Sequence, residues 1–345
     1  RQGQMCIRGR CCNNNMQYGN LSGNRGFAAP APTKQTGQMK LKPYMLLTAL
    51  GAMLVTQSCI LDHPDPCEAP LMLHFTYLHS RENDADPEHE IDLFGAEVDN
   101  VAVALYDADN GTFVESRTFR TEDMGPDHTV EWRVPYGSYN VVSWGGVRSR
   151  HTIDNAGLLE NHSLAIDGAE VEQQEEHVWH NLLAGVKVDG DSSVTHHADM
   201  HKITNNVLVT VTSVNGAALE SPTEARISVT NGRYDFRRAM TATVPTLYRP
   251  ASDTESDPFR HSHLFTVMRL HKGDDSQLSV IYPPIEEPIY DGPLSPMLAR
   301  IPYADLDLDD EWHLDFQVEP GPPGAFVVTV TVNGWKIIQY DVSLQ

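Results

Sequence analysis

Short segments of alternating apolar and polar residues, separated by turn residues, recur along this chain from residue 71 onward. Leu71, Leu73, Phe75 and Tyr77 share one face of the first segment, and this period of two is typical of a β-strand with one buried face. Similar segments cover residues 101–105, 130–134, 139–144, 206–213, 225–230 and 325–332. Strands at this spacing, without long helical periods between most of them, predict an all-β protein built as a sandwich.

Turn residues indicate how these strands connect. Asp107 to Gly111 (DADNG) and Asn333-Gly334 each lie between apolar runs, where Asn-Gly is a strong hairpin signal. We expect a third hairpin from residues 264–271 and 277–282. Residues 172–183 are the best helix candidate, and the proline-rich segment 283–302 is expected to cross between sheets. The chain therefore predicts β-sandwich architecture with short helices in the connections.

The length and the turn-rich segment near residue 190 predict two domains. Without residues 1–58 the chain has 287 residues, which suits two domains of about 100–200 residues each. We place the N-terminal sandwich at residues 59–190 and the C-terminal sandwich at residues 191–345.

The N-terminal part of the chain predicts export and lipid attachment. Lys40 and Lys42 precede the uncharged apolar run 44–55, which has the length of a signal-peptide core. The run is shorter than the about 20 residues that a membrane-spanning helix needs. Ser58 stands directly before Cys59, and this arrangement resembles a bacterial lipoprotein signal.

We therefore expect residues 39–58 to be a signal peptide cleaved after Ser58, with Cys59 carrying the acyl chains. The alternative is an ordinary secretory signal cut nearby. Residues 1–38 show no hydrophobic period, and we interpret them as an untranslated or disordered leader.

Charge and cysteine content limit the possible partners of the exported chain. From residue 59 onward it has 18 basic and 47 acidic residues, a formal charge of −29. Such a surface repels nucleic acid and anionic headgroups, so membrane attachment has to come from acyl chains. Cys59 and Cys67 are the cysteines in this part. With Cys59 acylated, Cys67 is expected to be an unpaired structural residue.

The sequence gives no specific sign of metal binding or catalysis. His196, His197 and His201 cluster, but no glutamate completes a His-Glu-x-x-His motif, and a strand follows directly. The acidic residues from Asp305 to Glu311 alternate with leucines and include no glycine, which favours a solvated strand edge over a calcium loop. No nucleophile elbow or phosphate-binding glycine loop is present. We expect no metal, no cofactor and no enzymatic activity.

Several segments, taken in order, resemble one known family. They are Asp65-Pro66-Cys67 before LMLHFTYLHS, EVDNVAVALYDADNGTFVES, VPYGSYNVVSWGG, HKITNNVLVTVT, NGRYDF and VTVTVNGWKIIQYDV. This order resembles the FimB-type fimbrial anchor and minor-subunit family of Gram-negative anaerobes over residues 59–345. No segment is a catalytic fingerprint, so the resemblance rests on order and spacing.

The resemblance implies an outer-membrane lipoprotein with two tandem transthyretin-like, immunoglobulin-like Greek-key β-sandwich domains. It implies acyl chains such as palmitate on Cys59, a position at the base of a fimbria, and a role in limiting fimbrial length. The implied partners are the fimbrial shaft subunit and the outer membrane. The resemblance further implies that subunits join when a strand of one is inserted into the sheet of the next, which is β-augmentation.

Two strands are candidates for these roles. Residues 71–78 follow the lipid directly, and we expect them to stay in place and close the N-terminal domain. The last segment of the chain is a candidate for contact with the next subunit, and the alternative is that it is simply the last strand of its own sandwich. Its apolar residues are Trp335, Ile337, Ile338, Tyr340, Val342 and Leu344.

Two other functions remain open from the sequence, besides an enzyme with convergent carboxylates. A fimbrial shaft or tip adhesin would be cut after an arginine in an exposed loop, and Arg81 is the candidate. A surface glycan-binding lipoprotein would present a row of exposed aromatic residues. The candidates for that row are Trp132, Trp144, Trp179, Trp312 and Trp335.

Overall fold

The computed structural model describes part of the chain, and contacts group Glu68–Gln345 into one compact unit. The described residues are 67–79, 91–155, 157–168, 170–172, 176–190, 194–215, 218–219, 221–250, 257–282, 288–321 and 325–343. Ser58, Cys59 and the predicted leader and signal peptide lie outside them. Among the described residues, no helix is both long and apolar enough to span a membrane.

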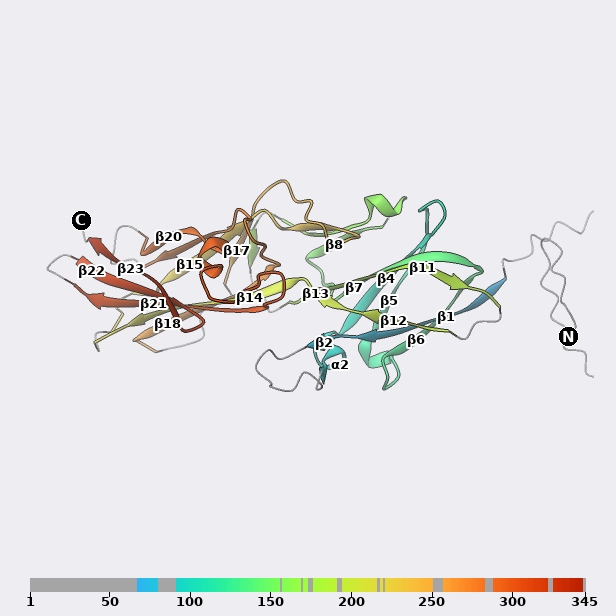
Figure 1. The fold of residues 1–345 in the computed structure, drawn as a ribbon, viewed down its shortest axis with the longest axis horizontal. Coiled ribbons are helices and arrows are strands. Elements are labelled where there is room, and N and C mark those ends of the chain that lie inside the picture. The colour runs from blue at the N-terminus through green and yellow to red at the C-terminus, as the bar shows by residue number, and fades with distance from the viewer. Residues whose placement is uncertain are drawn as a thin grey trace, which may run out of the picture. The chain divides into compact units, whose positions relative to one another are not determined.

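The N-terminal part of the unit contains two sheets that enclose one core. The first sheet has β1 (Glu68–Thr76) between β12 (Thr195–Asp199) and β6 (Thr129–Pro135), as Figure 1 shows in blue, yellow-green and green. The second sheet has the order β13 (His201–Lys202), β11 (Trp179–Val188), β7 (Gly137–Gly145), β4 (Asn100–Asp107) and β5 (Phe113–Arg120). Side chains from β1, β4, β6, β7 and β11 fill the space between them.

Two five-stranded sheets enclose the largest core, in the C-terminal part. One has the order β10 (Glu170–Glu172), β17 (Thr246–Arg249), β15 (Glu224–Val229), β19 (Gln277–Ile281) and β20 (Tyr290–Pro293). The other has the order β18 (Arg260–Met268), β14 (Thr204–Ser213), β21 (Glu311–Pro320), β22 (Ala325–Val332) and β23 (Trp335–Ser343). Their facing valines, leucines and aromatic residues form the core, so the fold class is all-β, as predicted.

Smaller elements complete the unit. They are the sheet β16 (Arg233–Asp235), β9 (Ser163–Ile166) and β8 (His151–Asp154), the pair β2 (Leu78–His79) and β3 (Ile91–Asp92), the helices α2 (Phe94–Glu97) and α3 (Ser295–Leu298), and the 3₁₀ turns η1 (Thr121–Asp123) and η2 (Leu159–Asn161). A third apolar cluster joins Trp144 and Tyr106 to Tyr234 and Met268.

The pairing of strands bears on the predicted domain division at residue 190. β10 pairs with β17 and β12 pairs with β1. Strands on both sides of residue 190 therefore share sheets, and the division there stays a prediction.

The strands and hairpins with clear local signals form as the sequence indicates. Leu71, Leu73 and Phe75 of β1 are each at most 1% exposed. β4 pairs with β5 across the Asp107–Gly111 turn, and β22 pairs with β23 across Asn333-Gly334. The φ angles of Asn333 and Gly334 are 46° and 80°, and two successive positive φ values are what a two-residue type I′ hairpin turn requires.

The predicted helix over residues 172–183 is wrong, because Trp179–Val188 is the strand β11. Trp179, His180 and Asn181 are all buried, since side chains cover both faces of the strand there. The period of two is further interrupted by a bulge between Leu183 and Val186. A strand buried on both faces cannot be distinguished from a helix segment by its hydrophobic pattern alone.

The predicted hairpin between residues 264–271 and 277–282 is also wrong. β18 pairs with β14, whereas β19 pairs with β15 and β20, so the two strands lie in different sheets. The Asp274 carboxylate accepts hydrogen bonds from the backbone N–H groups of His271 and Ser276. This side chain holds the connection in a turn that leads from one sheet to the other.

Cys67 is disulfide-bonded, so the expectation that it is unpaired is wrong. Its partner lies outside the described residues. The expectation assumed a processed chain: once residues 1–58 are removed and Cys59 is acylated, no other cysteine remains to pair with Cys67. For the proposed anchor, the disulfide would therefore belong to the chain before processing.

Candidate anchoring strand and subunit-contact edge

The strand that follows the predicted lipid site is built into the middle of a sheet. β1 pairs in parallel with β12 over five residues and antiparallel with β6 over seven. Leu71, Leu73 and Phe75 are buried in the core, and Phe75 stacks on Phe94 with ring centroids 5.7 Å apart. Burial of each such side chain stabilises a fold by about 1.5–3 kcal/mol. Removal of β1 would therefore expose the core and leave two strands without a partner.

Hydrogen bonds and a ring contact also fix the chain at Tyr77, directly after β1. The Asp92 carboxylate accepts hydrogen bonds from the backbone N–H groups of Tyr77 and Phe94, both at 2.9 Å. The backbone N–H of Leu93 donates to the carbonyl oxygen of Tyr77 at 2.8 Å. The Tyr77 ring packs edge-on against Trp179. These contacts fix the chain directly after the strand.

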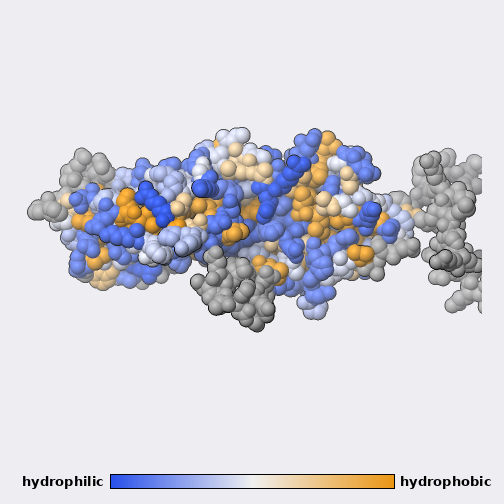
Figure 2. Space-filling view, viewed as in Figure 1, coloured by the Kyte–Doolittle hydropathy of each residue, from blue (hydrophilic) through white to orange (hydrophobic). Residues whose placement is uncertain are grey.

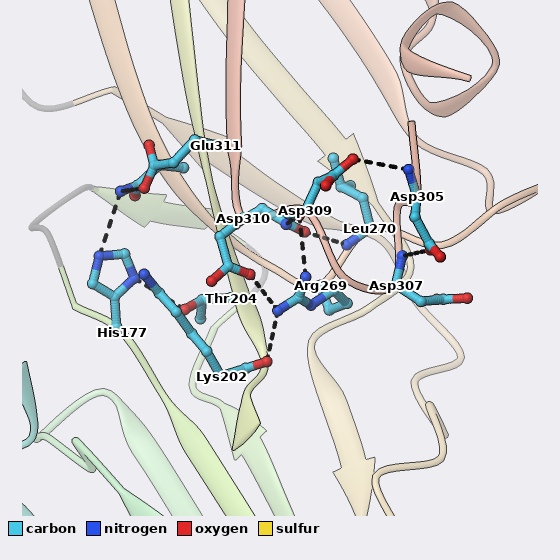
Figure 3. Close-up of polar contacts among 12 residues, drawn as sticks. His177, Lys202, Thr204, Arg269, Leu270, Asp305, Asp307, Asp309, Asp310 and Glu311 are labelled. Carbon is cyan, nitrogen blue, oxygen red and sulfur yellow. Dashed lines mark hydrogen bonds and ion pairs between the residues drawn. The ribbon is translucent and has the colours of Figure 1, made fainter. Parts of the chain in front are cut away.

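A buried ion pair connects this part of the chain to the C-terminal sheets (Figure 3). Arg269 Nη2 lies 2.6 Å from Asp310 Oδ1, and both side chains are at most 10% exposed. The same guanidinium donates to the carbonyl oxygens of Lys202 at 2.7 Å and Asp309 at 3.2 Å. The Tyr77 hydroxyl lies 3.4 Å from Asp310 Oδ2. Arg269 and Asp310 together thus join the β13 segment, the loop before β21 and Tyr77, which directly follows β1.

His177 and its neighbours form the other polar contact in this region (Figure 3). Its Nδ1 lies 3.0 Å from the Thr204 hydroxyl. Burial, with the nearby charge of Lys202, lowers the pKa of His177 to about 3. The ring is therefore neutral at physiological pH. A neutral imidazole here avoids a second positive charge next to the buried Lys202.

The acidic run from Asp305 to Glu311 does not form the predicted strand edge. Residues 305–308 form turns, and β21 begins only at Glu311. The Asp305 carboxylate accepts a hydrogen bond from the backbone N–H of Asp307. The Asp309 carboxylate accepts one from the backbone N–H of Asp305. Leu306 is buried and Leu308 is exposed, so their alternation comes from a turn. Within the described residues, no group of three or more possible metal ligands is found.

The predicted subunit-contact strand lies at the edge of its own sheet. β23 pairs with β22 over its length, and no other described strand pairs with its outer side. The Tyr340 hydroxyl donates to the carbonyl oxygen of Ile289, before β20. The end of the chain is therefore the last strand of its own sheet, which is one of the two interpretations that the sequence left open. Its contact with a neighbouring subunit stays a prediction.

The side chains of β23 differ in how accessible they are. Trp335 is 56% exposed, whereas Val342 is 9% exposed. Ile337, Ile338 and Tyr340 are partly buried against the core, and Leu344 lies outside the described residues. Figure 2 shows a hydrophobic patch over the part of the surface formed by β20, β22 and β23, and further hydrophobic patches elsewhere on the same face. No strand of the described residues pairs with the outer backbone groups of this edge, which also carries apolar side chains.

The tryptophans do not form an exposed row. Trp132, Trp144, Trp179 and Trp312 are each at most 2% exposed, so Trp335 is the exception among the five. The glycan-binding alternative therefore lacks the aromatic surface that would favour it.

One cavity of about 710 Å³ lies among α2, β5 and η1. Glu97, Asp99 and Glu122 line it. Their carboxylates lie 3.9 Å from Lys202, 2.8 Å from Arg148 and 2.5 Å from Arg120, respectively. Each of these carboxylates has its own cation. The three carboxylates therefore do not show the unpaired, convergent geometry of a catalytic acid and base.

Comparison with known proteins identifies the family. The family described as "Fimbrillin-A associated anchor proteins Mfa1 and Mfa2" matches residues 64–341. The chain belongs to this family. It is a family of fimbrial anchor proteins and not an enzyme family, which agrees with the resemblance inferred from the sequence.

Individual relatives agree with this membership. The minor fimbrium anchoring subunit Mfa2 of Porphyromonas gingivalis is 23% identical over 331 residues, which cover 87% of this chain and 94% of the relative. The solved structure of the fimbrial anchor protein Mfa2 from Porphyromonas gingivalis matches with a TM-score of 0.60 and 20% identity, covering 79% of this chain and 100% of that one.

A candidate polysaccharide-binding protein of Bacteroides thetaiotaomicron matches with a TM-score of 0.63 and 19% identity, covering 80% of this chain and 98% of that one. A candidate adhesin of Bacteroides ovatus matches with a TM-score of 0.62 and 18% identity, covering 81% and 97%. At these identities the structural matches show a shared fold alone.

Sequence reasoning noted Asp310 only as part of an acidic run, and it missed Arg269 and the ion pair between the two. The signal was an arginine directly after the apolar end of β18, in Val267-Met268-Arg269-Leu270. A charge in such a run is rarely buried without a partner. The partner lies 41 residues away, so the sequence alone could not identify it.

Proposed function

We propose that this protein anchors a fimbria to the bacterial outer membrane. Acyl chains on Cys59 hold it in the membrane, and the globular unit binds the adjacent shaft subunit. Membership in the fimbrial anchor family supports this role, and the lipoprotein-like signal before Cys59 supports the attachment. Two or more acyl chains are enough for stable attachment.

The observation that carries the proposal is the position of β1. Eight residues separate Cys59 from Glu68, where β1 begins. Even a fully extended chain of that length reaches at most about 32 Å. The lipid is therefore linked by a short tether to a strand that is paired on both sides. A pulling force on the tether therefore acts on β1, the central strand of its sheet.

The same geometry disfavours a shaft role. A cut after Arg81, which lies outside the described residues, would detach β1 from the rest of the chain. Leu71, Leu73 and Phe75 would then leave the core. An anchor has to keep this strand, because the strand carries the lipid.

The free edge of β23 is the proposed contact with the shaft. An added strand could pair with the outer backbone groups of β23, and Trp335 would supply an apolar contact. An anchor whose own first strand stays in place offers no open groove for a further subunit at its membrane end. In this way it limits the length of the fimbria at its base.

Substitution of Cys59 tests the attachment. With Cys59→Ser, labelled palmitate should no longer be incorporated, and fimbriae should appear in the culture supernatant. Arg81→Ala is the matched control, because an uncut anchor does not depend on that arginine. Retention of normally attached fimbriae by the Cys59→Ser strain would refute the proposal.

A further inference from the structure

Two histidines of the first sheet face each other across neighbouring strands. His74 of β1 is in register with His197 of β12. Their Nδ1 atoms are 2.8 Å apart, and the rings meet edge to face with centroids 4.9 Å apart. One ring has to donate its N–H to the other. The two Nδ1 atoms therefore lie close enough for one metal ion to bind both after a small rotation of the rings.

The separation of these nitrogens matches a tetragonal metal site. Metal–imidazole bonds are about 2.0 Å long, so two nitrogens at 90° around one ion lie about 2.8 Å apart. Two nitrogens bound to tetrahedral zinc with the same bond length would lie about 3.3 Å apart. Square-planar and tetragonal coordination is typical of Cu²⁺ and Ni²⁺, and Cu²⁺ binds nitrogen ligands most tightly among the first-row divalent ions.

The site is accessible from solvent. His197 is exposed and His74 is half-buried, because both lie on the face of β1 and β12 opposite the core. The Asp127 carboxylate interacts electrostatically with His74. The Asp199 carboxylate accepts a hydrogen bond from Thr76 on the same face. The acidic surroundings favour a cation at this position.

We propose that His74 and His197 form a binding site for one divalent transition-metal ion with tetragonal geometry, Cu²⁺ or Ni²⁺. Both Nδ1 atoms coordinate the ion, and water completes its coordination. The ring that carried hydrogen on Nδ1 takes the Nε2–H tautomer, so two neutral rings bind the ion without net release of a proton.

A bound ion would link β12 to β1. β12 is a five-residue edge strand, and it covers one side of the strand that follows the predicted lipid. Because only the folded sheet brings the two rings together, the ion raises the stability of the folded state. This inference does not depend on the anchor function, since it concerns binding alone.

Titration of the purified mature protein, without a histidine tag, with Cu²⁺ tests the site. We expect one ion bound with a two-nitrogen hyperfine pattern in its electron paramagnetic resonance spectrum. Loss of a residue that only hydrogen-bonds to a metal ligand typically lowers metal affinity about 10–100-fold, and loss of a ligand itself should cost at least as much. His74→Asn and His197→Asn should therefore each weaken this binding at least about tenfold, measured by calorimetry.

His313→Asn is the matched control, because His313 is an exposed histidine on a strand, β21. It should leave the affinity and the spectrum unchanged. Circular dichroism of each variant verifies folding, and His197→Asn replaces an exposed side chain. Equal affinity in the folded double variant His74→Asn/His197→Asn, or an unchanged two-nitrogen pattern, would overturn the proposal.

Discussion

The clearest test of the core is the response of buried His162 to acid. Trp144 Nε1 donates to His162 Nε2 at 2.7 Å, so that nitrogen carries no hydrogen. His162 Nδ1 lies 2.7 Å from the Tyr106 hydroxyl, which in turn donates to the carbonyl oxygen of Asn155. The ring is 1% exposed. Protonation of Nε2 would break the bond to Trp144 and place a charge in the core.

The magnitude follows from the pKa of this ring in the two states. Burial lowers the pKa of His162 to about 4 in the folded protein, against about 6.5 in the unfolded chain. Between these values the unfolded state binds more protons, so the contribution to stability is complete above pH 6.5 and is lost as the pH falls toward 4. At pH 5 the loss is about 2 kcal/mol.

Urea unfolding at pH 7 and pH 5 measures this effect. The wild-type protein should lose about 2 kcal/mol more unfolding free energy between the two values than His162→Gln does. Gln keeps an acceptor for Trp144 but does not titrate, and the other buried histidines are present in both proteins. An equal loss in both proteins would refute the account of His162.

Three further predictions concern the Arg269–Asp310 ion pair and the edge strand β23. Asp310→Asn leaves the buried Arg269 without its counter-charge and should lower the unfolding free energy by about 3–5 kcal/mol in denaturant titrations; an effect below about 1 kcal/mol would show that water solvates this site. Trp335→Ala removes a side chain that is 56% exposed and should change stability by at most about 0.5 kcal/mol, while reducing recruitment of fimbriae to the cell surface. Deletion of residues 337–345 should abolish recruitment in a protein that remains folded by circular dichroism; unfolding of the truncated protein, or normal recruitment, would contradict a contact role for β23.

The parts of the fold that depend on local patterns were predictable from the sequence. β1 alternates over four buried residues, and the Asn-Gly turns specify the β4–β5 and β22–β23 hairpins. In each case neighbouring residues determine the structure. The edge position of β23 was one of two interpretations, because the pattern of an edge strand does not reveal what pairs with its outer side.

The parts that depend on distant contacts were not predictable. β11 is covered on both faces, which hides its period, and the β18–β19 connection changes sheet because Asp274 shapes its turn. The acidic run around Asp305 alternates with leucines as a strand does, but its carboxylates cap turns. The Arg269–Asp310 pair and the His74–His197 pair each join segments that only the folded sheets bring together.

Mass spectrometry of the mature N-terminus tests the central claim most directly. The account predicts a first residue Cys59 that carries acyl chains, followed by an intact chain through Arg81 and Glu82. A chain that starts at Glu82, an unmodified amino end, or a Cys59 joined to Cys67 by a disulfide would contradict it.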